Sequence, residues 1–255
     1  CLHIIYFSKA LGSRNRMAGP LGKKVNTPAS FSPDILFPIE REQQRHRFGL
    51  DVMSGEDIWN LHEIHWLDHE NKAHKNETAL IINAESKFTV ESKSMKLFIN
   101  SFIHERFQDF DEVRQTIIQH IEPITLNGFL GFTDIYECPP SSRSTNIRVE
   151  SDYNLKPEVN LYDGFVTYRF LGFRSLCPVT GQPDLADIVL TADIDQDQKS
   201  NIAAYLGSFF NKECFHESCI ELIHKELNSS GIKVKQTEGF FERRGGIAIV
   251  PVRNS

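Results

Sequence analysis

The same apolar helix pattern occurs once in each half of this 255-residue chain. In both copies four apolar side chains recur at i, i+3, i+4 and i+7, which places them on one face of a helix. They are Met95, Phe98, Ile99 and Phe102 in the first copy, and Ile202, Tyr205, Leu206 and Phe209 in the second. Strand-like runs flank both copies, which indicates one strand-strand-helix-helix-strand-strand unit used twice. The repeat is too long for a solenoid and predicts two fused α+β modules whose sheets pack against helices.

The expected elements divide the chain into four segments. Residues 1–50 are rich in Pro, Gly, Lys and Arg and predict an extended N-terminal arm. The first module is expected over 51–137 and the second over 162–255. Residues 138–161 contain two adjacent prolines and charges without a period, so they predict a linker.

Within each module the apolar patterns predict individual elements. The first module is expected to have strands over 58–67 and 78–84 around a polar turn at 68–76, helices over 92–102 and around 113–121, and a strand over 129–136. The second is expected to have strands over 164–173 and 188–194, helices from about 196 and 215, and strands over 232–241 and 247–252.

Charge and cysteine content exclude several classes of function. A net charge of -6 argues against a nucleic-acid-binding surface, so we expect no direct nucleic-acid partner. The five cysteines include no C-x-x-C pair and the ten histidines no H-E-x-x-H spacing, so we expect neither a disulfide framework nor a metal site. No apolar run approaches the roughly 20 residues that span a bilayer. A cytoplasmic protein without a membrane partner fits these features best.

The segment 177–184, with the sequence CPVTGQPD, has the composition of a rigid turn. Its two prolines have fixed φ angles and its glycine relieves the turn, so little entropy is lost when it orders. Such a turn can hold the Cys177 thiol and the Asp184 carboxylate over one small volume, as a nucleophile and its proton partner. The alternative is that Cys177 is a buried small apolar residue.

The first of the repeated helices begins with a group of polar donors. Free backbone N–H groups at a helix start attract anions, and Ser92, Lys93 and Lys96 add donors and positive charge, so a phosphate could bind there. The alternative is a capped, solvated helix start, in which Glu91 favours the helix dipole.

Two further segments combine residue types that suit a binding site. Phe215-His216-Glu217 supplies an aromatic plane, an imidazole and a carboxylate, which the first turn of a helix could aim at one ligand. Arg243-Arg244-Gly245-Gly246 joins guanidinium groups to glycines that allow close backbone approach to phosphate oxygens. The alternatives are a core Phe215 beside exposed polar residues, and a plain basic turn.

Taken in order, these segments resemble the signature segments of the QueF family. Its members are NADPH-dependent nitrile reductases that convert 7-cyano-7-deazaguanine to 7-aminomethyl-7-deazaguanine, on the route to the modified tRNA base queuosine. The matching segments are 91–98 ESKSMKLF, 177–184 CPVTGQPD, 215–217 FHE and 243–246 RRGG, with 57–59 DIW, Glu63 and 66–67 WL upstream. The resemblance implies the long, bimodular type, built from two tunnelling-fold modules and active as a homodimer.

The resemblance also implies roles in the chemical step. Cys177 would attack the nitrile carbon and form a covalent thioimide, with Asp184 protonating the nitrogen and His216 beside the reacting carbon. The substrate base would be held by Val90, Glu91, Ser92, Phe215, His216 and Glu217. NADPH would be held by Ser92, Lys93, Lys96, Arg244 and Gly245.

The chain departs from the family pattern at three positions, and other functions remain open. The departures are Leu185, Ala248 and Val250. One alternative is a thiol hydrolase of nitriles or amides, because Cys177, a carboxylate and Lys93 could form such a site. Another is a purine-binding module without catalysis. A cyclohydrolase of the same fold would need a zinc site that the sequence does not suggest.

Overall fold

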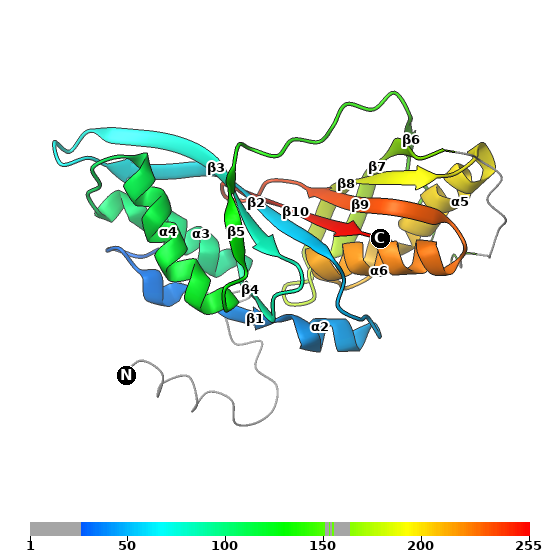
Figure 1. Ribbon diagram of the computed structural model, residues 1–255, viewed down its shortest axis with the longest axis horizontal. Helices are drawn as coiled ribbons and strands as arrows, with labels where there is room; N and C mark the ends of the chain where they lie inside the picture. The colour runs from blue at the N-terminus through cyan, green and yellow to red at the C-terminus, as the bar shows by residue number, and fades with distance from the viewer. Residues whose placement is uncertain (1–26, 151–152, 154, 156–163) are drawn as a thin grey trace.

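The computed structural model describes residues 27–150, 153, 155 and 164–255. In this part of the chain eight strands form one open sheet, in the order β5-β3-β2-β10-β9-β8-β7-β6 (Figure 1). The strands are β2 Gly55–Leu67, β3 Ala73–Asn83, β5 Phe129–Thr133, β6 Ser144–Asn146, β7 Val166–Leu176, β8 Pro183–Asp193, β9 Lys233–Phe241 and β10 Ile247–Asn254. Neighbours are antiparallel except for β6 and β7. The predicted α+β class is confirmed.

Helices pack on one face of this sheet and bury the repeated apolar residues. The helical segments are η1 Pro33–Ile35, α2 Arg41–Arg47, α3 Ser92–Asn100, η2 Ser101–His104, α4 Phe110–Thr125, α5 Gln196–Gly207, η3 Ser208–Asn211 and α6 His216–Ser229. One core lies under α3 and α4 and a second under α5 and α6. All eight residues of the two helix patterns are buried in these cores, which confirms the predicted helix faces.

The two halves are joined at the centre of the sheet by the C-terminal strand. β10 pairs with β2 from Ile247 to Arg253, but it pairs with β9 only over Val252–Asn254. The rest of β10, toward Ile247, is not paired with β9, so the two strands separate there. Ile249 and Trp59 are paired on β10 and β2 and both belong to the core under α3 and α4, so their side chains lie on the side of the sheet that carries these helices.

The segment after β5 crosses the opposite side of the sheet from α4 and α6 (Figure 1). Asn60 fixes it there by donating from Nδ2 to the Tyr136 carbonyl and accepting from the Tyr136 N–H, both at 2.9 Å. The Tyr136 hydroxyl donates to Glu238, whose pKa is raised by burial. The crossing segment ends in β6, where Thr145 pairs in parallel with Phe170 of β7.

Two predicted loops contain more structure than the sequence indicated. The turn expected over 68–76 is shorter, because β3 begins at Ala73; its first residues are polar and extend past the core, so they show no apolar alternation. The linker expected over 138–161 contains β6, a three-residue strand too short for a periodic signal. The module boundaries themselves stay predictions.

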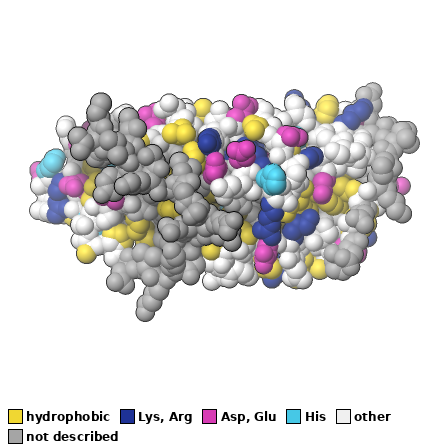
Figure 2. Space-filling view, turned by 90° about the horizontal axis from the view of Figure 1, so that it is seen from below, with side chains coloured by type: hydrophobic (Ala, Val, Ile, Leu, Met, Phe, Trp, Pro, Cys, Tyr) yellow, Lys and Arg dark blue, Asp and Glu magenta, His cyan; other side chains and the backbone are white. Residues whose placement is uncertain are grey.

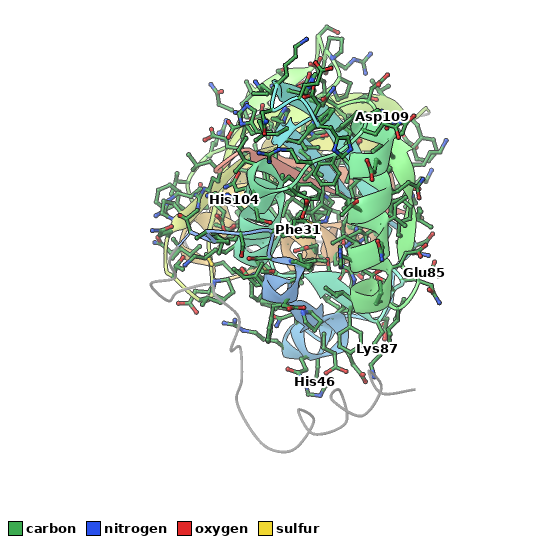
Figure 3. All side chains as sticks on the ribbon, turned by 90° about the vertical axis from the view of Figure 1, so that its left-hand side faces the viewer. Phe31, His46, Glu85, Lys87, His104 and Asp109 are labelled. Carbon is green, nitrogen blue, oxygen red and sulfur yellow. The ribbon has the colours of Figure 1, made fainter. Side chains whose placement is uncertain are left out.

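The described part of the arm is not simply extended. Its strand β1, Pro38–Glu40, pairs with β4, Phe88–Val90, and α2 follows at once. Phe31, labelled in Figure 3, packs against the rings of Phe98, Phe102 and His120. The helix was missed because its buried face carries arginines instead of apolar residues. Residues 1–26 of the predicted arm lie outside the described residues.

The surface agrees with the modest net charge. On the face shown in Figure 2, acidic and basic side chains are interspersed with apolar ones. No helix among the described residues is long and apolar enough to cross a membrane.

Candidate active site

A cavity of about 650 Å³ lies where β9 and β10 part, and both halves of the chain contribute to its walls. Of the residues predicted for the site, those that line it are Val90, Glu91, Ser92, Lys93, Lys96, Cys177, Asp184, Phe215, His216, Glu217 and Arg244. Gly245 is not among the lining residues. The structure therefore brings together segments that are far apart in the sequence, while their individual roles stay predictions.

The Cys177 loop is a tight connection between β7 and β8. The Cys177 N–H donates to the Gln182 carbonyl and the Gly181 N–H donates to the Cys177 carbonyl, both at 2.9 Å. Gly181 has a φ of 66°, which glycine adopts without strain. Cys177 is 9% exposed and lines the same cavity as Asp184 and Ser92, so burial does not remove it from the site.

Asp184 is held between a cation and an imidazole. Its Oδ1 lies 3.0 Å from Arg244 Nη1, and its Oδ2 lies 3.4 Å from His216 Nε2. The His216 ring in turn stacks on Phe241, with ring centroids 4.0 Å apart. These contacts orient the carboxylate and the imidazole toward each other inside the cavity.

The start of α6 presents three consecutive residues to the cavity. Phe215 is the residue before the helix and has extended backbone angles, so its side chain can share a cavity with those of the first turn. Glu217 follows in that turn, next to His216. Burial raises the pKa of Glu217, and the Asp57 carboxylate raises it further. A carboxylate in such a setting is a strong acceptor for ligand N–H groups.

Glu91 supports the alternative interpretation of the start of α3, that of a capped helix. Its carboxylate accepts from the backbone N–H groups of Lys93 and Ser94, each at 2.8 Å, and so caps the helix. Two of the backbone donors that were expected to bind phosphate are therefore occupied by a negative group. An anion at this helix would depend on the side chains of Ser92, Lys93 and Lys96. Burial raises the pKa of Glu91, although these two hydrogen bonds oppose that shift.

The turn between β9 and β10 brings a second basic segment to the cavity. Gly245 has a φ of 55°, and a Cβ there would overlap the Lys96 side chain, so the turn packs directly on that lysine. Arg243 forms an ion pair with Glu63, whereas the half-exposed Arg244 reaches into the cavity. Lysine and arginine side chains against a glycine turn fit the phosphate groups of a dinucleotide such as NADPH.

Three of the polar residues that line the cavity were not identified from the sequence. Arg41 and Gln44 reach it from α2, and Glu221 reaches it from α6. Asp57, which forms an ion pair with Arg41, gave a weak signal of buried charge in the sequence. It lies two residues before Trp59 in the same strand, so alternation turns both side chains to the same face. Charged residues are mostly solvent-exposed, so the pattern alone favoured a surface position.

The three departures from the family pattern lie away from the cavity. Ile247 and Ile249 line it, and strand alternation turns Ala248 and Val250 to the opposite face. Val250 packs there in a small cluster with Ile58. Leu185 follows Asp184 and is 39% exposed. Within the described ranges, no His, Cys, Asp and Glu side chains are grouped to hold a metal ion.

Two family sequence models match the chain. Residues 27–127 match "Nitrile reductase, 7-cyano-7-deazaguanine-reductase N-term", and residues 183–255 match "QueF-like protein". The first range contains the segment from Val90 to Lys96, and the second contains Asp184, the 215–217 segment and Arg244. Cys177 lies between the two ranges.

Curated relatives cover nearly the whole chain. It is 32% identical to the NADPH-dependent 7-cyano-7-deazaguanine reductase of Coxiella burnetii, over 92% of this chain and 91% of the relative. The proteins of that name from Desulfotalea psychrophila and Burkholderia ambifaria are 30% and 29% identical, over 92% of this chain and 92% and 93% of their own lengths. With such similarity along its length, this chain belongs to the QueF family of nitrile reductases.

Proposed function

We propose that this protein is an NADPH-dependent 7-cyano-7-deazaguanine reductase. It reduces the nitrile to the primary amine 7-aminomethyl-7-deazaguanine, in the biosynthesis of the modified tRNA base queuosine. The observation that carries the proposal is that one cavity is lined by Cys177, by Asp184 and by a glutamate at the start of each of α3 and α6, beside basic side chains.

The first step is covalent. The Cys177 thiol gives its proton to the Asp184 carboxylate, and its sulfur attacks the nitrile carbon, so that a C–S bond forms and one π bond of the nitrile breaks. Its electron pair goes to the nitrogen, which takes a proton from Asp184. The resulting thioimide is an activated C=N group, so a difficult reduction is divided into easier steps. Asp184 is positioned for the transfer by Arg244 and His216.

Recognition of the base uses the two glutamates. Carboxylate oxygens accept hydrogen bonds, and the pyrimidinone edge of a deazaguanine presents adjacent N–H donors. Each Glu91 carboxylate oxygen accepts a hydrogen bond from one backbone N–H and has a second lone pair that can accept from the ligand. Phe215 packs on the ring, and Val90 and Ser92 complete the pocket.

Two NADPH molecules, bound in turn, would each supply one hydride for the four-electron reduction. The C–S bond to Cys177 would break between the two reductions and release the thiolate. The chain's own contribution is to bind the phosphates through Ser92, Lys93, Lys96 and Arg244, and to let the turn approach closely at Gly245. His216, fixed by its stacking on Phe241, lies beside the reacting carbon. The cavity is partly open, so the bound base and cofactor would themselves shield the imine from water between the two reductions.

The setting of the enzyme follows from the family and the composition. We expect a homodimer in the cytoplasm, without a membrane or a direct nucleic-acid partner. The net charge of -6 and the four free cysteines among the described residues support this expectation.

The test is to incubate the protein with 7-cyano-7-deazaguanine and NADPH and to measure cofactor oxidation and products together. The proposal expects two NADPH molecules oxidised for each amine formed. Ammonia release without NADPH oxidation would instead indicate a thiol hydrolase. Tight binding of the base with no turnover would indicate a non-catalytic purine-binding protein.

A further inference from the structure

Five buried charged side chains form a cluster, and two of them, Arg41 and Glu221, also line the cavity. We call it the arginine–carboxylate cluster; its members are Arg41 and Arg45 of α2, Asp57 of β2, Glu221 of α6 and Arg253 of β10. None is more than 5% exposed. Burial of so many charges is expensive unless they are paired and hydrogen-bonded, so the arrangement needs a physical reason.

Arg253 is the centre of the cluster. Its Nη1 donates to Asp57 Oδ1 at 2.9 Å, and its Nη2 donates to Glu221 Oε1 at 3.0 Å. Arg45 donates two hydrogen bonds to the Glu221 carboxylate, from Nη2 to Oε1 at 2.7 Å and from Nε to Oε2 at 3.1 Å. These contacts tie the arm helix, the central sheet and α6 together.

Arg41 is the member of the cluster at the cavity wall. Its Nη2 lies 2.6 Å from Asp57 Oδ2, and Arg41 itself lines the cavity together with Glu217. It belongs to the same α2 face as Arg45, while the opposite face carries the exposed His46, labelled in Figure 3. The arm therefore places a buried guanidinium beside the substrate pocket.

The charges of the cluster do not balance without a further group. Three guanidinium groups face two carboxylates, which leaves one buried positive charge in excess. Glu217 is the adjacent carboxyl group that can neutralise it. Three charged or titratable groups act on Glu217, namely Arg41 from α2, Asp57 from β2 and its α6 neighbour His216. Glu221 of the same helix also lines the cavity. Burial and Asp57 raise the pKa of Glu217, whereas Arg41 and His216 lower it.

We propose that Arg41 is a substrate-positioning residue, which holds Glu217 as the carboxylate that accepts hydrogen bonds from the base. The inference rests on the proposed function, because it assigns Glu217 to the substrate. It adds that the N-terminal arm is part of the binding site, through a residue that need not touch the reacting atoms.

The test measures reversible binding of 7-cyano-7-deazaguanine in the full chain with Cys177→Ala, where no covalent adduct forms. Isothermal titration calorimetry across the acidic and neutral range gives the affinity and the pH at which it falls. Arg41→Gln is expected to weaken binding roughly tenfold or more near neutral pH, because a charged acceptor is lost. The acidic fall in affinity should also move to higher pH, since Glu217 then protonates more easily.

Asp57→Asn provides a change of opposite sign. It removes a negative neighbour of Glu217, so the acidic fall in affinity should move to lower pH. Arg41→Lys keeps the charge and should keep the profile near that of the parent. Both Arg41→Gln and Asp57→Asn damage the same cluster, so a purely structural effect would change the two profiles in the same direction or not at all. Either of those results overturns the proposal.

Two further variants control the interpretation. Glu217→Gln should remove the part of the acidic fall that comes from Glu217 and leave the part that comes from Glu91. Arg41→Gln added to Glu217→Gln should cost no further affinity and should not shift the remaining fall. Arg114→Gln on α4, where Arg114 pairs with Asp111 at the surface, should leave the profile unchanged. If Arg41→Gln does not fold, the direction given by Asp57→Asn decides. A parent protein that fails to bind the base contradicts the proposed function itself, whereas normal binding without the two opposite shifts contradicts only the role of Arg41.

Discussion

Arg244 Nη1 lies 3.0 Å from Asp184 Oδ1, so the residue proposed to bind the cofactor contacts the residue proposed to protonate the substrate. The first comes from the turn between β9 and β10, and the second from the start of β8. Cofactor binding and proton transfer therefore share one ion pair. Variants on either side of this pair should have effects that separate the two roles.

Arg244→Met should impair both the cofactor step and the covalent step. Loss of a charged donor to a phosphate is expected to raise the KM for NADPH roughly tenfold or more. Adduct formation, which needs no NADPH, should slow as well, because Asp184 loses a contact that orients it. Lys96→Met is the matched variant, since Lys96 packs on Gly245; it should raise the KM for NADPH and leave adduct formation unchanged. Equal effects of both variants on adduct formation would contradict this division.

Asp184→Asn tests the proton donor. The amide has nearly the same shape but does not supply the acidic proton, so thioimide formation should slow by between about a hundredfold and ten-thousandfold. The rate of thioimide formation is measured by mass spectrometry of the protein in samples quenched at set times after mixing with substrate. A rate near that of the parent would show that another group protonates the nitrogen.

Gly245→Ala tests the contact between the basic turn and Lys96. Alanine at a φ of 55° costs about 1 kcal/mol of backbone strain, and its Cβ would also displace the lysine side chain. The KM for NADPH should therefore rise. Gly49→Ala is the control, because Gly49 has a φ of 61° with no atom within 4 Å of an added Cβ. Gly49→Ala should lower the unfolding temperature about as much as Gly245→Ala does, and it should leave the KM for NADPH unchanged. A rise of this KM in both variants would mean that general backbone strain is the cause.

His224 should make the stability of the protein fall in mild acid. Burial lowers its pKa to about 4, and its ring nitrogens contact Thr237 Oγ1 and Ser255 Oγ, each at 2.9 Å. Between about pH 6.5 and 4 the unfolded chain binds a proton that the folded chain does not, so stability falls as pH falls, by roughly 1.4 kcal/mol per pH unit at most. His224→Gln should flatten this part of the curve in urea unfolding experiments. An unchanged slope would show that His224 does not titrate on unfolding.

Local patterns in the sequence were sufficient for the four longer helices, α3 to α6, and for most strands. The apolar spacing around Phe98 and Phe209 identified the two buried helix faces, because tertiary packing requires that periodicity. It could not predict that β10 pairs with β2, since that pairing joins residues nearly two hundred positions apart. Nor could it find β6, whose three residues pair in parallel at the sheet edge.

The site shows the same division between local and long-range information. Residue chemistry and the family resemblance selected Cys177, Asp184 and Glu217, and the structure brings them to one cavity. The capped start of α3 was one of two alternatives, and the sequence could not decide between them because capping by Glu91 depends on its side-chain geometry. Arg41 was missed because an arginine in a polar arm rich in basic residues resembles a solvated surface residue, and only the fold shows what it faces.

The account depends above all on a covalent bond between Cys177 and the nitrile carbon. The most direct measurement is the intact mass of the protein after incubation with 7-cyano-7-deazaguanine in the absence of NADPH. One substrate mass should be added to each chain, and the addition should be absent in Cys177→Ala. A protein that reduces the nitrile without forming this adduct, or an adduct that persists in Cys177→Ala, would contradict the account.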